Sequence, residues 1–323
     1  MKNLFVLIFT LLVSTIQYAQ VGVGPIEMVK LKSGKFSKKD LTQLKSTKTV
    51  FVYRDSDDVE VLKKAIQEVW DFTEISFVPF SELKNIDPYT SSVFSIAGVN
   101  TNTSFVKEST GATSLNYDNT HIYLNLWMMQ ENPKKKKSIK KSYCRIELHP
   151  TYTDYSMVTG SRSKDALTYI YEEGTLKNWK VGFLKNYLKQ VNDHLTKEEE
   201  RWLFKSDKKN PKLRKIKNKT LYIPDYALVK FNKFTGDESQ RLDPKKLLKN
   251  YPHKTKIISA DELNEMILDP TKNINYMVYV KSSTDKYIYI FNSKTGDILY
   301  SKYKGTSYNL KTKDFKDLAK AIK

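Results

Sequence analysis

Histidine and cysteine are the residues best suited to metal binding or acid–base chemistry, and this chain has few of them. The histidines are His121, His149, His194 and His253, and the one cysteine is Cys144. None stands in an H-x-x-x-H, H-E-x-x-H or C-x-x-C spacing, the patterns that bring zinc ligands together. A hairpin would bring His121 and His149 near each other on one face, but two imidazoles without a third ligand make a weak site. We therefore predict no metal ion and no cofactor.

Motifs for a catalytic nucleophile are also missing. The sequence contains no G-x-S-x-G elbow and no P-loop. Thr159-Gly160-Ser161 lies in a polar segment with no histidine at a motif spacing, and acidic pairs such as Glu172-Glu173 mean little among 36 Asp and Glu residues. We name no catalytic residue. An enzyme assembled from scattered residues stays open, although the sequence leans towards a protein without catalysis.

Cys144 is expected to be structural. A single cysteine cannot close a disulfide within the chain. Cys144 alternates with Ile146 and Leu148, so the three side chains point to one face of a strand. We predict a small buried core residue.

The opposite face of the same hairpin is the candidate binding face. Aliphatic side chains alternate with aromatic and charged ones along residues 121–129 and 143–149. The candidate binding face consists of His121, Tyr123, Trp127, Tyr143, Arg145, Glu147 and His149. Rings combine apolar area with a polar group, which suits a ligand platform. The same composition suits packing between two lobes or two protomers, and both alternatives stay open.

A lysine-rich turn is the second candidate surface. Its lysines are Lys134, Lys135, Lys136, Lys137, Lys140 and Lys141. The matching turn of the second half, Ser293–Asp297, is short and contains Gly296, as in a compact hairpin loop. The longer turn is either a solvated loop or an anion-contact loop that binds acidic lipid or polysaccharide electrostatically.

The elements that position these residues are predicted to follow the same order in both halves. In the first half, strands are expected at Thr49–Tyr53, Ile75–Phe80, Ser91–Ala97, His121–Met129 and Tyr143–His149. Helices are expected at Ser37–Lys45, after the Asp57-x-x-Glu60 start, from Ser81, at Leu176–His194 and, short and charged, at Thr196–Lys205. Gly98–Asn119 is too long for an ordinary connection and is predicted to be a mobile loop or an irregular excursion.

The second half repeats this order. Its expected strands are Lys219–Ile223, Lys256–Ser259, Tyr276–Lys281, Tyr287–Asn292 and Ile298–Tyr303, and its helices lie around Pro244–Asn250, from Ser259 and at Lys313–Ile322. We predict an α/β (α+β) fold with a duplicated β-α-β-α-β-β-β-α unit, two lobes, and mixed sheets with helices mainly on one face. The expected segments are a signal peptide at 1–19, a first repeat with an N-terminal extension and the lysine-rich hairpin at 20–205, and a second repeat at 206–323.

Composition and the N-terminus indicate export. The chain has 323 residues and a formal net charge of +19. Lys2 and the apolar run Leu4–Val13 are typical of a signal peptide, with cleavage expected after Ala19. No other run reaches the roughly 18 apolar residues of a membrane helix, so we expect no transmembrane segment in the mature chain. RNP and helix-turn-helix signatures are missing, and nucleic acid is not an expected partner.

Two segments carry a resemblance. The leader, the Lys- and Tyr-rich chain, Lys217–Tyr226 (KNKTLYIPDY) and Val280–Tyr287 (VKSSTDKY) resemble uncharacterised secreted proteins of Bacteroidetes-type bacteria. The resemblance covers most of the mature chain and implies no activity. The chain ends in an amphipathic helix rather than a β-rich sorting module, which favours the periplasm over an extracellular location.

These features favour an exported, non-catalytic binding or interaction protein of unknown ligand. Fitting partners are anionic envelope lipid or polysaccharide, or another protein. The alternative is an envelope hydrolase acting on glycan or peptide. Placement of Glu147, Arg145 and Trp127 at a cleft would favour that alternative.

If the leader directs export, the protein isolated from its native host should begin near Gln20, because signal peptidase removes the segment that ends at Ala19. Mass spectrometry of the N-terminal peptide measures this. Recovery of intact Met1 in the cytoplasm would contradict export.

Overall fold

The computed structural model describes residues 21–27, 32–106, 113–132, 137–160, 163–203, 206–208, 210–232 and 235–322. The predicted signal peptide lies outside these residues. Within these ranges, no helix has both the length and the apolar character needed to cross a membrane.

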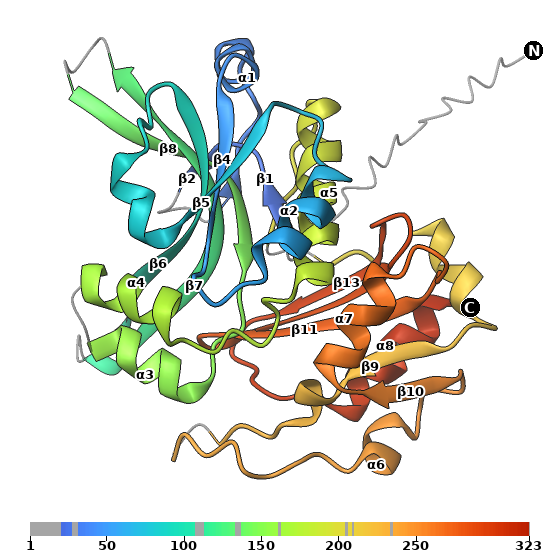
Figure 1. Cartoon of the computed structure of the whole chain (residues 1–323). Helices are drawn as coiled ribbons and strands as arrows, with labels where there is room; N and C mark the ends of the chain where they lie inside the picture. Colours follow the sequence, from blue (N-terminus) through green and yellow to red (C-terminus); the bar gives the residue numbers. More distant parts are fainter. Residues whose placement is uncertain are drawn as a thin grey trace, which may run out of the picture.

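The first lobe is built on a six-stranded mixed sheet with the strand order β1-β8-β7-β6-β4-β5 (Figure 1). Its strands are β1 (Val21–Val23), β4 (Lys48–Tyr53), β5 (Ile75–Pro79), β6 (Ser91–Val106), β7 (Thr113–Asn132) and β8 (Lys137–Glu147), and β2 (Ile26–Glu27) pairs separately with β3 (Lys32–Ser33). Its helices are α1 (Lys38–Lys45), α2 (Val59–Gln67), the 3-10 helix η1 (Phe80–Asn85), α3 (Tyr152–Gly160), α4 (Ser163–Glu172) and α5 (Val181–Thr196).

The second lobe is built on a five-stranded mixed sheet with the order β10-β9-β11-β12-β13. Its strands are β9 (Leu221–Pro224), β10 (Thr255–Ile258), β11 (Asn275–Ser282), β12 (Asp285–Asn292) and β13 (Ile298–Lys304). Its helices are α6 (Pro244–Leu248), α7 (Ala260–Leu268) and α8 (Thr312–Ile322), with 3-10 helices η2 (Pro211–Ile216) and η3 (Asp225–Leu228).

The two sheets share one strand order. With β1 set aside, β5-β4-β6-β7-β8 corresponds to β10-β9-β11-β12-β13. In each sheet a central strand pairs in parallel with two neighbours, and the remaining strands form antiparallel hairpins. Parallel neighbours need a crossover, which contains α2 between β4 and β5 and α6 between β9 and β10. The predicted α/β fold with two lobes and mixed sheets is confirmed.

Helix starts follow the capping residues, with one correction. Ser37 caps α1 and forms a capping box with Asp40, and Ser259 caps α7 by accepting from the Glu262 amide. The prediction that Asp57 begins α2 was wrong by one residue, because Asp58 is the N-cap. The Asp57 carboxylate instead accepts hydrogen bonds from the Arg54 amide and the Trp179 indole.

The segment Gly98–Asn119 was wrongly predicted as a loop. Strands β6 and β7 continue through it, and their ladder runs from Val93 opposite Trp127 to Val106 opposite Thr113. Residues 107–112 lie outside the described ranges. Threonine tolerates the extended backbone well, and antiparallel pairing satisfies the amides of a polar segment without apolar burial.

Two further helix predictions were wrong. Helix α5 begins at Val181 rather than Leu176, and residues 197–203 contain no helix. Glu198 there has a left-handed backbone (φ 59°), and Arg201 instead bridges to Val23 on β1. Helices α3 and α4 were not predicted. For α3, apolar and polar side chains are not separated onto opposite faces, and its last residues, Thr159 and Gly160, were assigned to a polar segment.

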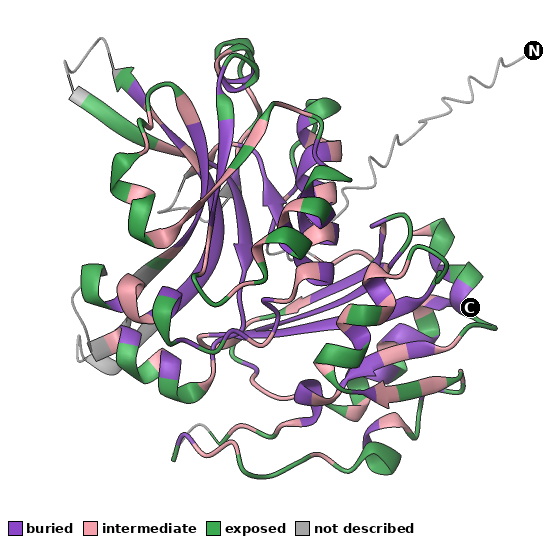
Figure 2. Ribbon diagram, viewed as in Figure 1, coloured by how far each residue is buried: buried purple, intermediate pink, exposed green. Residues whose placement is uncertain are grey.

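Helix α5 lies between the lobes and packs on both. Its Phe183 ring stacks on Tyr276 of β11 at 5.6 Å, and Tyr187 contacts Phe291 of β12 at 5.9 Å. Trp179, just before α5, contacts Phe51 of β4 at 6.2 Å. Buried residues fill the strands of both sheets, and exposed residues lie on the outer sides of the helices (Figure 2). Cys144 is fully buried, as predicted.

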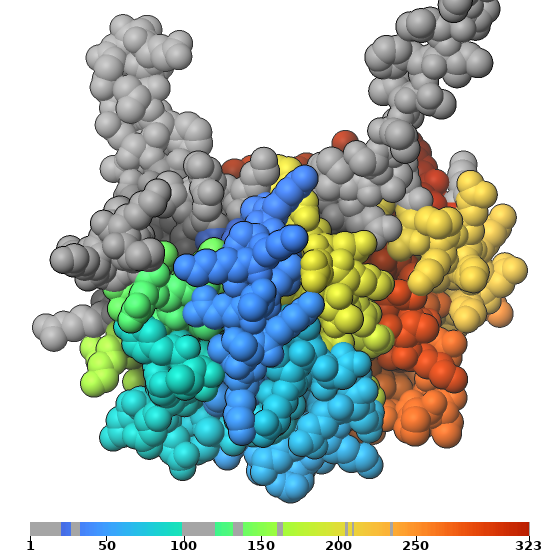
Figure 3. All heavy atoms as spheres, turned by 90° about the horizontal axis from the view of Figure 1, so that it is seen from above, coloured from blue at the N-terminus to red at the C-terminus, as the bar shows by residue number. Residues whose placement is uncertain are grey.

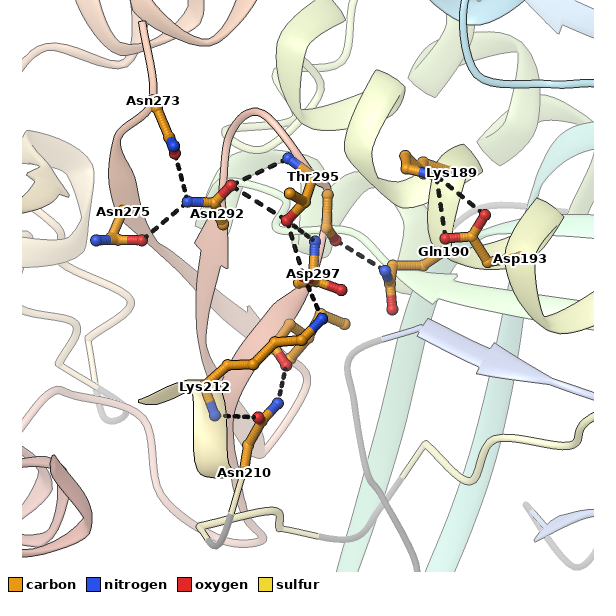
Figure 4. A network of polar contacts seen from close by, with 12 residues as sticks. Lys189, Gln190, Asp193, Asn210, Lys212, Asn273, Asn275, Asn292, Thr295 and Asp297 are labelled. Atoms are coloured by element: carbon orange, nitrogen blue, oxygen red, sulfur yellow. Dashed lines mark hydrogen bonds and ion pairs between the residues drawn. The ribbon is translucent and has the colours of Figure 1, made fainter. Parts of the chain in front are cut away.

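The short β12–β13 turn supports this packing (Figure 4). Gly296 has a left-handed backbone (φ 66°), which glycine adopts readily. Its carbonyl accepts a hydrogen bond from Gln190 of α5 at 2.8 Å, and Asp297 pairs with Lys212 of η2 at 2.8 Å. The turn therefore fastens the second sheet to the shared helix.

Helix α8 is held by a buried carboxylate. Asp314 pairs with Lys286 of β12 and with Lys302 of β13, the latter at 2.6 Å, and all three side chains are largely buried. Burial alone would raise the pKa of Asp314, but the two ammonium groups lower it below its usual value.

Replacing Asp314 with alanine should destabilise the protein by about 3–5 kcal/mol, because two buried ammonium groups lose their shared partner. Urea unfolding at pH 7 measures the loss. Asp317→Ala is the matched control, since Asp317 pairs with Lys302 from a more exposed position, and it should cost about 1 kcal/mol or less. An equal loss in the free energy of unfolding from the two variants would contradict the role of Asp314 as the buried partner of both lysines.

Candidate functional site

The candidate binding face is an interior surface. His121, Tyr123, Tyr143, Arg145, Glu147 and His149 are each at most 5% exposed, and Trp127 is partly buried. A ligand platform was one of the two alternatives that the sequence left open for this face. Of the two alternatives, packing is the one that the burial of these side chains supports.

The Glu147 carboxylate is the centre of this surface. It accepts hydrogen bonds from the Arg145 guanidinium and, at 2.5 Å, from the Ser282 hydroxyl. The His121 Nδ1 atom lies 3.3 Å from the same carboxylate, and the Arg145 guanidinium lies 4.4 Å from the Tyr123 ring centre. Ser282 belongs to β11, so these contacts join the two lobes. We call Arg145, Glu147, His121 and Ser282 the inter-lobe cluster.

Electrostatics keep this carboxylate ionised. Burial raises the pKa of Glu147, but the charge of Arg145 and hydrogen bonds from His121 and Ser282 outweigh it and bring the pKa to about 2. A buried ion pair is costly to break from one side, because the remaining charge is left without a partner. The inter-lobe cluster thus stabilises the contact between the two sheets.

The inter-lobe cluster has the residue types of a hydrolytic triad without the geometry. A serine nucleophile and an acid must contact different nitrogens of the histidine. Here the single Nδ1 atom of His121 lies 3.1 Å from the Ser282 Oγ and 3.3 Å from the Glu147 Oε2. Ser282 is also fully buried. The arrangement does not provide an accessible nucleophile.

His149 makes a second contact between the lobes. Its Nδ1 atom lies 3.2 Å from the Tyr279 carbonyl, and the Tyr226 and Tyr279 rings contact it edge-on. Burial, followed by the charges of Lys281 and Lys177, lowers the pKa of His149 well below its usual value. Among the described residues, no group of three or more His, Cys, Asp or Glu side chains is arranged to hold a metal ion.

The lysine-rich turn is shorter than predicted. Lys137, Lys140 and Lys141 belong to β8, opposite Asn132, Met129 and Met128, so they are ladder residues rather than loop residues. Lys134, Lys135 and Lys136 lie outside the described ranges. The Lys140 ammonium lies 3.9 Å from the Trp127 ring centre, where burial lowers its pKa. Lys141 pairs with Asp40 of α1.

A groove runs between α1 and this hairpin. Its volume is about 660 Å³, and one wall is the exposed side of α1 with Lys38, Lys39, Thr42, Gln43 and Ser46. The other wall is formed by Tyr89 and by Met129, Gln130 and Glu131 of β7. We call this the α1–hairpin groove. Sequence patterns did not reveal it, because its two walls are 43 or more residues apart in the chain.

A second hollow, the inter-lobe cleft, lies between the lobes and has a volume of about 580 Å³. Its walls include Arg54, Ser56, Glu172, Glu173 and Trp179 of the first lobe and Asp225, Tyr226, Ser259 and Asp261 of the second. Several of these residues directly follow parallel strands, β4, β9 and β10. Ligands of open α/β sheets commonly bind outside the carboxyl ends of the strands. The sequence could have indicated these residues, because several lie at the carboxyl ends of predicted strands. It could not show that the residues of both lobes line one cleft, which depends on how the lobes pack.

Asp57 supports one wall of the inter-lobe cleft. Both of its carboxylate oxygens accept from the Trp179 indole at 3.1 Å, and the Arg54 amide donates at 2.9 Å. Burial raises the pKa of Asp57 despite these hydrogen bonds. The carboxylate therefore fixes the orientation of Trp179 beside the cleft.

Replacing Glu147 with glutamine should destabilise the protein by about 3–5 kcal/mol at pH 7, because Arg145 keeps its charge in a buried site. The folded pKa of Glu147 lies below its unfolded value, so its stabilisation is complete above about pH 4.5 and is lost as the pH falls towards about 2. Urea unfolding measures the free energy of unfolding of both proteins. The difference in this free energy between parent and variant should become smaller as the pH falls over that range.

Glu74→Gln provides the control, since Glu74 forms an exposed ion pair with Lys48. It should change stability by less than about 1 kcal/mol. A Glu147→Gln difference that stays constant from pH 7 to pH 2 would contradict the assigned ionisation.

Comparison with known proteins gives no functional information about these surfaces. No protein-family model matches the chain, and neither curated proteins nor solved structures gave a significant match. A function can therefore be argued only from the residues and surfaces described above.

Proposed function

We propose that this protein is an exported, non-catalytic binding protein that holds a polar ligand in the inter-lobe cleft. One observation carries the proposal. Both lobes contribute loops from the carboxyl ends of their parallel strands to one hollow of about 580 Å³. That volume falls in the range of small-ligand sites.

Some side chains around the cleft already form hydrogen bonds or ion pairs within the protein, and others do not. Arg54 donates to the carbonyls of Tyr171 and Gly174, and Lys180 pairs with Asp261 across the lobes at 2.5 Å. Glu172 and Glu173 form no ion pair within the described part of the chain. Among the charged groups of the lining, Glu172 and Glu173 are therefore the ones left to a ligand, since Lys177 pairs with Glu238. As hydrogen-bond acceptors they suit a ligand with hydroxyl or amine donors.

The same arrangement supports the proposal of binding without catalysis. The inter-lobe cluster has residue types suited to hydrolysis but lies in the interior, and Glu147 and Arg145 do not line the cleft. The hydrolase alternative named these residues, so no observation favours it.

Export and domain organisation complete the proposal. The apolar run Leu4–Val13 supports an exported protein of the periplasm, in keeping with the resemblance to secreted proteins of Bacteroidetes-type bacteria. The shared strand order supports an internal duplication with a boundary near residue 205.

Filling the cleft should abolish ligand binding without unfolding the protein. Ser56 is exposed at the cleft, so Ser56→Trp places an indole there. Chitobiose or trilysine should raise the melting temperature of the parent by about 2–4 °C at ten times its dissociation constant, whereas triglutamate should not. Differential scanning calorimetry measures the shift, which Ser56→Trp should lose.

Ser81→Trp is the matched control, because Ser81 is an exposed serine of η1 away from the cleft. It should keep the ligand-induced shift. The proposal fails if neither chitobiose nor trilysine stabilises the parent, or if the two tryptophan variants respond alike.

A further inference from the structure

The α1–hairpin groove combines positive charge, an exposed ring and neutral polar side chains. Its volume of about 660 Å³ exceeds that of the inter-lobe cleft. It lies on the face of the molecule where α1 projects, seen from above in Figure 3. It shares no lining residue with the cleft, so a function of this groove would be additional.

The charge of the groove comes from the first turn of α1. Lys38 and Lys39 are exposed there and form no ion pair within the described residues. Positive charge at a helix N-terminus is unfavourable, because the helix dipole adds positive potential. The neighbouring Asp40 offsets the dipole as the capping-box carboxylate, but it already pairs with Lys141, so it does not pair with Lys38 or Lys39. An anion beside this turn would relieve the repulsion.

The opposite wall offers a ring in a defined position. Tyr89 is 46% exposed, and its hydroxyl donates to Ser138 of β8 at 2.5 Å. The adjacent Pro88 carbonyl accepts from the Met129 amide of β7 at 2.8 Å. The ring is therefore held against the hairpin with apolar area open to solvent. Such a ring can stack on the C–H face of a sugar.

Neutral polar groups also line the groove. Thr42 and Gln43 face the groove from α1, and Gln130 faces it from β7. The Gln130 amide donates to the Tyr143 hydroxyl at 2.5 Å, which fixes the orientation of its side chain. Glu131 is the acidic residue of the lining, set against the two lysines. Hydroxyl-rich ligands need such donors and acceptors beside the charged groups.

We propose that the α1–hairpin groove binds a segment of acidic polysaccharide. Lys38 and Lys39 pair with its carboxylates, Thr42 and Gln43 meet its hydroxyls, and Tyr89 stacks on a sugar ring. A flat anionic membrane fits less well. A bilayer would meet the rims of a concave groove and would dehydrate its amide and hydroxyl side chains without replacing their hydrogen bonds.

The test measures the affinity of the full mature protein for polygalacturonate by biolayer interferometry. Lys38→Gln combined with Lys39→Gln should weaken binding roughly tenfold at low salt, since two exposed ion pairs are lost. The matched control is Lys245→Gln with Lys246→Gln, which removes two exposed lysines from the first turn of α6. It should weaken binding less than about twofold.

The ring is tested separately. Tyr89→Ser should weaken binding to polygalacturonate about five- to tenfold even at 0.5 M salt, because stacking is not screened. Tyr152→Ser, at another partly exposed tyrosine, should leave the affinity unchanged. Ser56→Trp should also leave it unchanged, so this result does not depend on the inter-lobe cleft.

Three outcomes would overturn the proposal. Equal losses from the two lysine pairs would show that only overall charge matters. Absence of binding to polygalacturonate would exclude the polysaccharide. Stronger binding of phosphatidylglycerol vesicles, with the same dependence on Lys38, Lys39 and Tyr89, would identify a membrane surface as the partner instead.

Discussion

The buried carboxylate of Glu147 is the interaction on which the arrangement of the two lobes depends. An ionised carboxylate away from water costs several kcal/mol unless it is paired and hydrogen-bonded. Arg145 on the same strand supplies the charge, and His121 and Ser282 lie within hydrogen-bond distance. Because Ser282 belongs to the second lobe, the first lobe alone cannot complete this environment. The sheets are therefore held in one relative position rather than joined by a flexible linker.

Helix α5 extends the same constraint to the cleft. Its Gly182 amide donates to Asn264 of α7 at 2.8 Å, and a side chain at Gly182 would meet Ile267 at 2.9 Å. The close approach of these helices thus requires glycine. Trp179 and Lys180, which precede α5, form part of the cleft wall. The shape of the proposed ligand site is consequently set in part by interior packing around Trp179 and α5.

The lysines of this chain differ in whether a carboxylate of the protein already holds them. Lys286, Lys302 and Lys141 are committed to buried or partly buried carboxylates, where they stabilise the fold. Lys38 and Lys39 have no such partner within the described residues and are available to an outside anion. A net charge of +19 by itself therefore says little about partners. Whether a given lysine has a carboxylate partner within the protein is more informative about binding than the net charge.

The sequence by itself determined the elements whose signals are local. Alternation along β7, β8 and β12 identified strands and their two faces, Ser37 and Ser259 marked helix starts, and Gly296 marked a tight turn. Local signals gave the wrong N-cap where two adjacent aspartates could each begin a helix. Asp58 rather than Asp57 caps α2, because Asp57 is engaged by Arg54 and Trp179, which lies far along the chain.

Only the tertiary structure decided what each surface is for. The candidate binding face became an interior contact because β11 of the second sheet meets Glu147, His121 and His149, and α1 meets Tyr143. Alternation cannot distinguish a face covered by protein from one that awaits a ligand. The long β6–β7 hairpin depends on pairing between polar strands, which leaves no apolar pattern to detect. Both proposed sites lie between elements distant in sequence, and their geometry exists only after the chain has packed. Local patterns report backbone preference and polarity, whereas burial and concavity are properties of the assembled lobes.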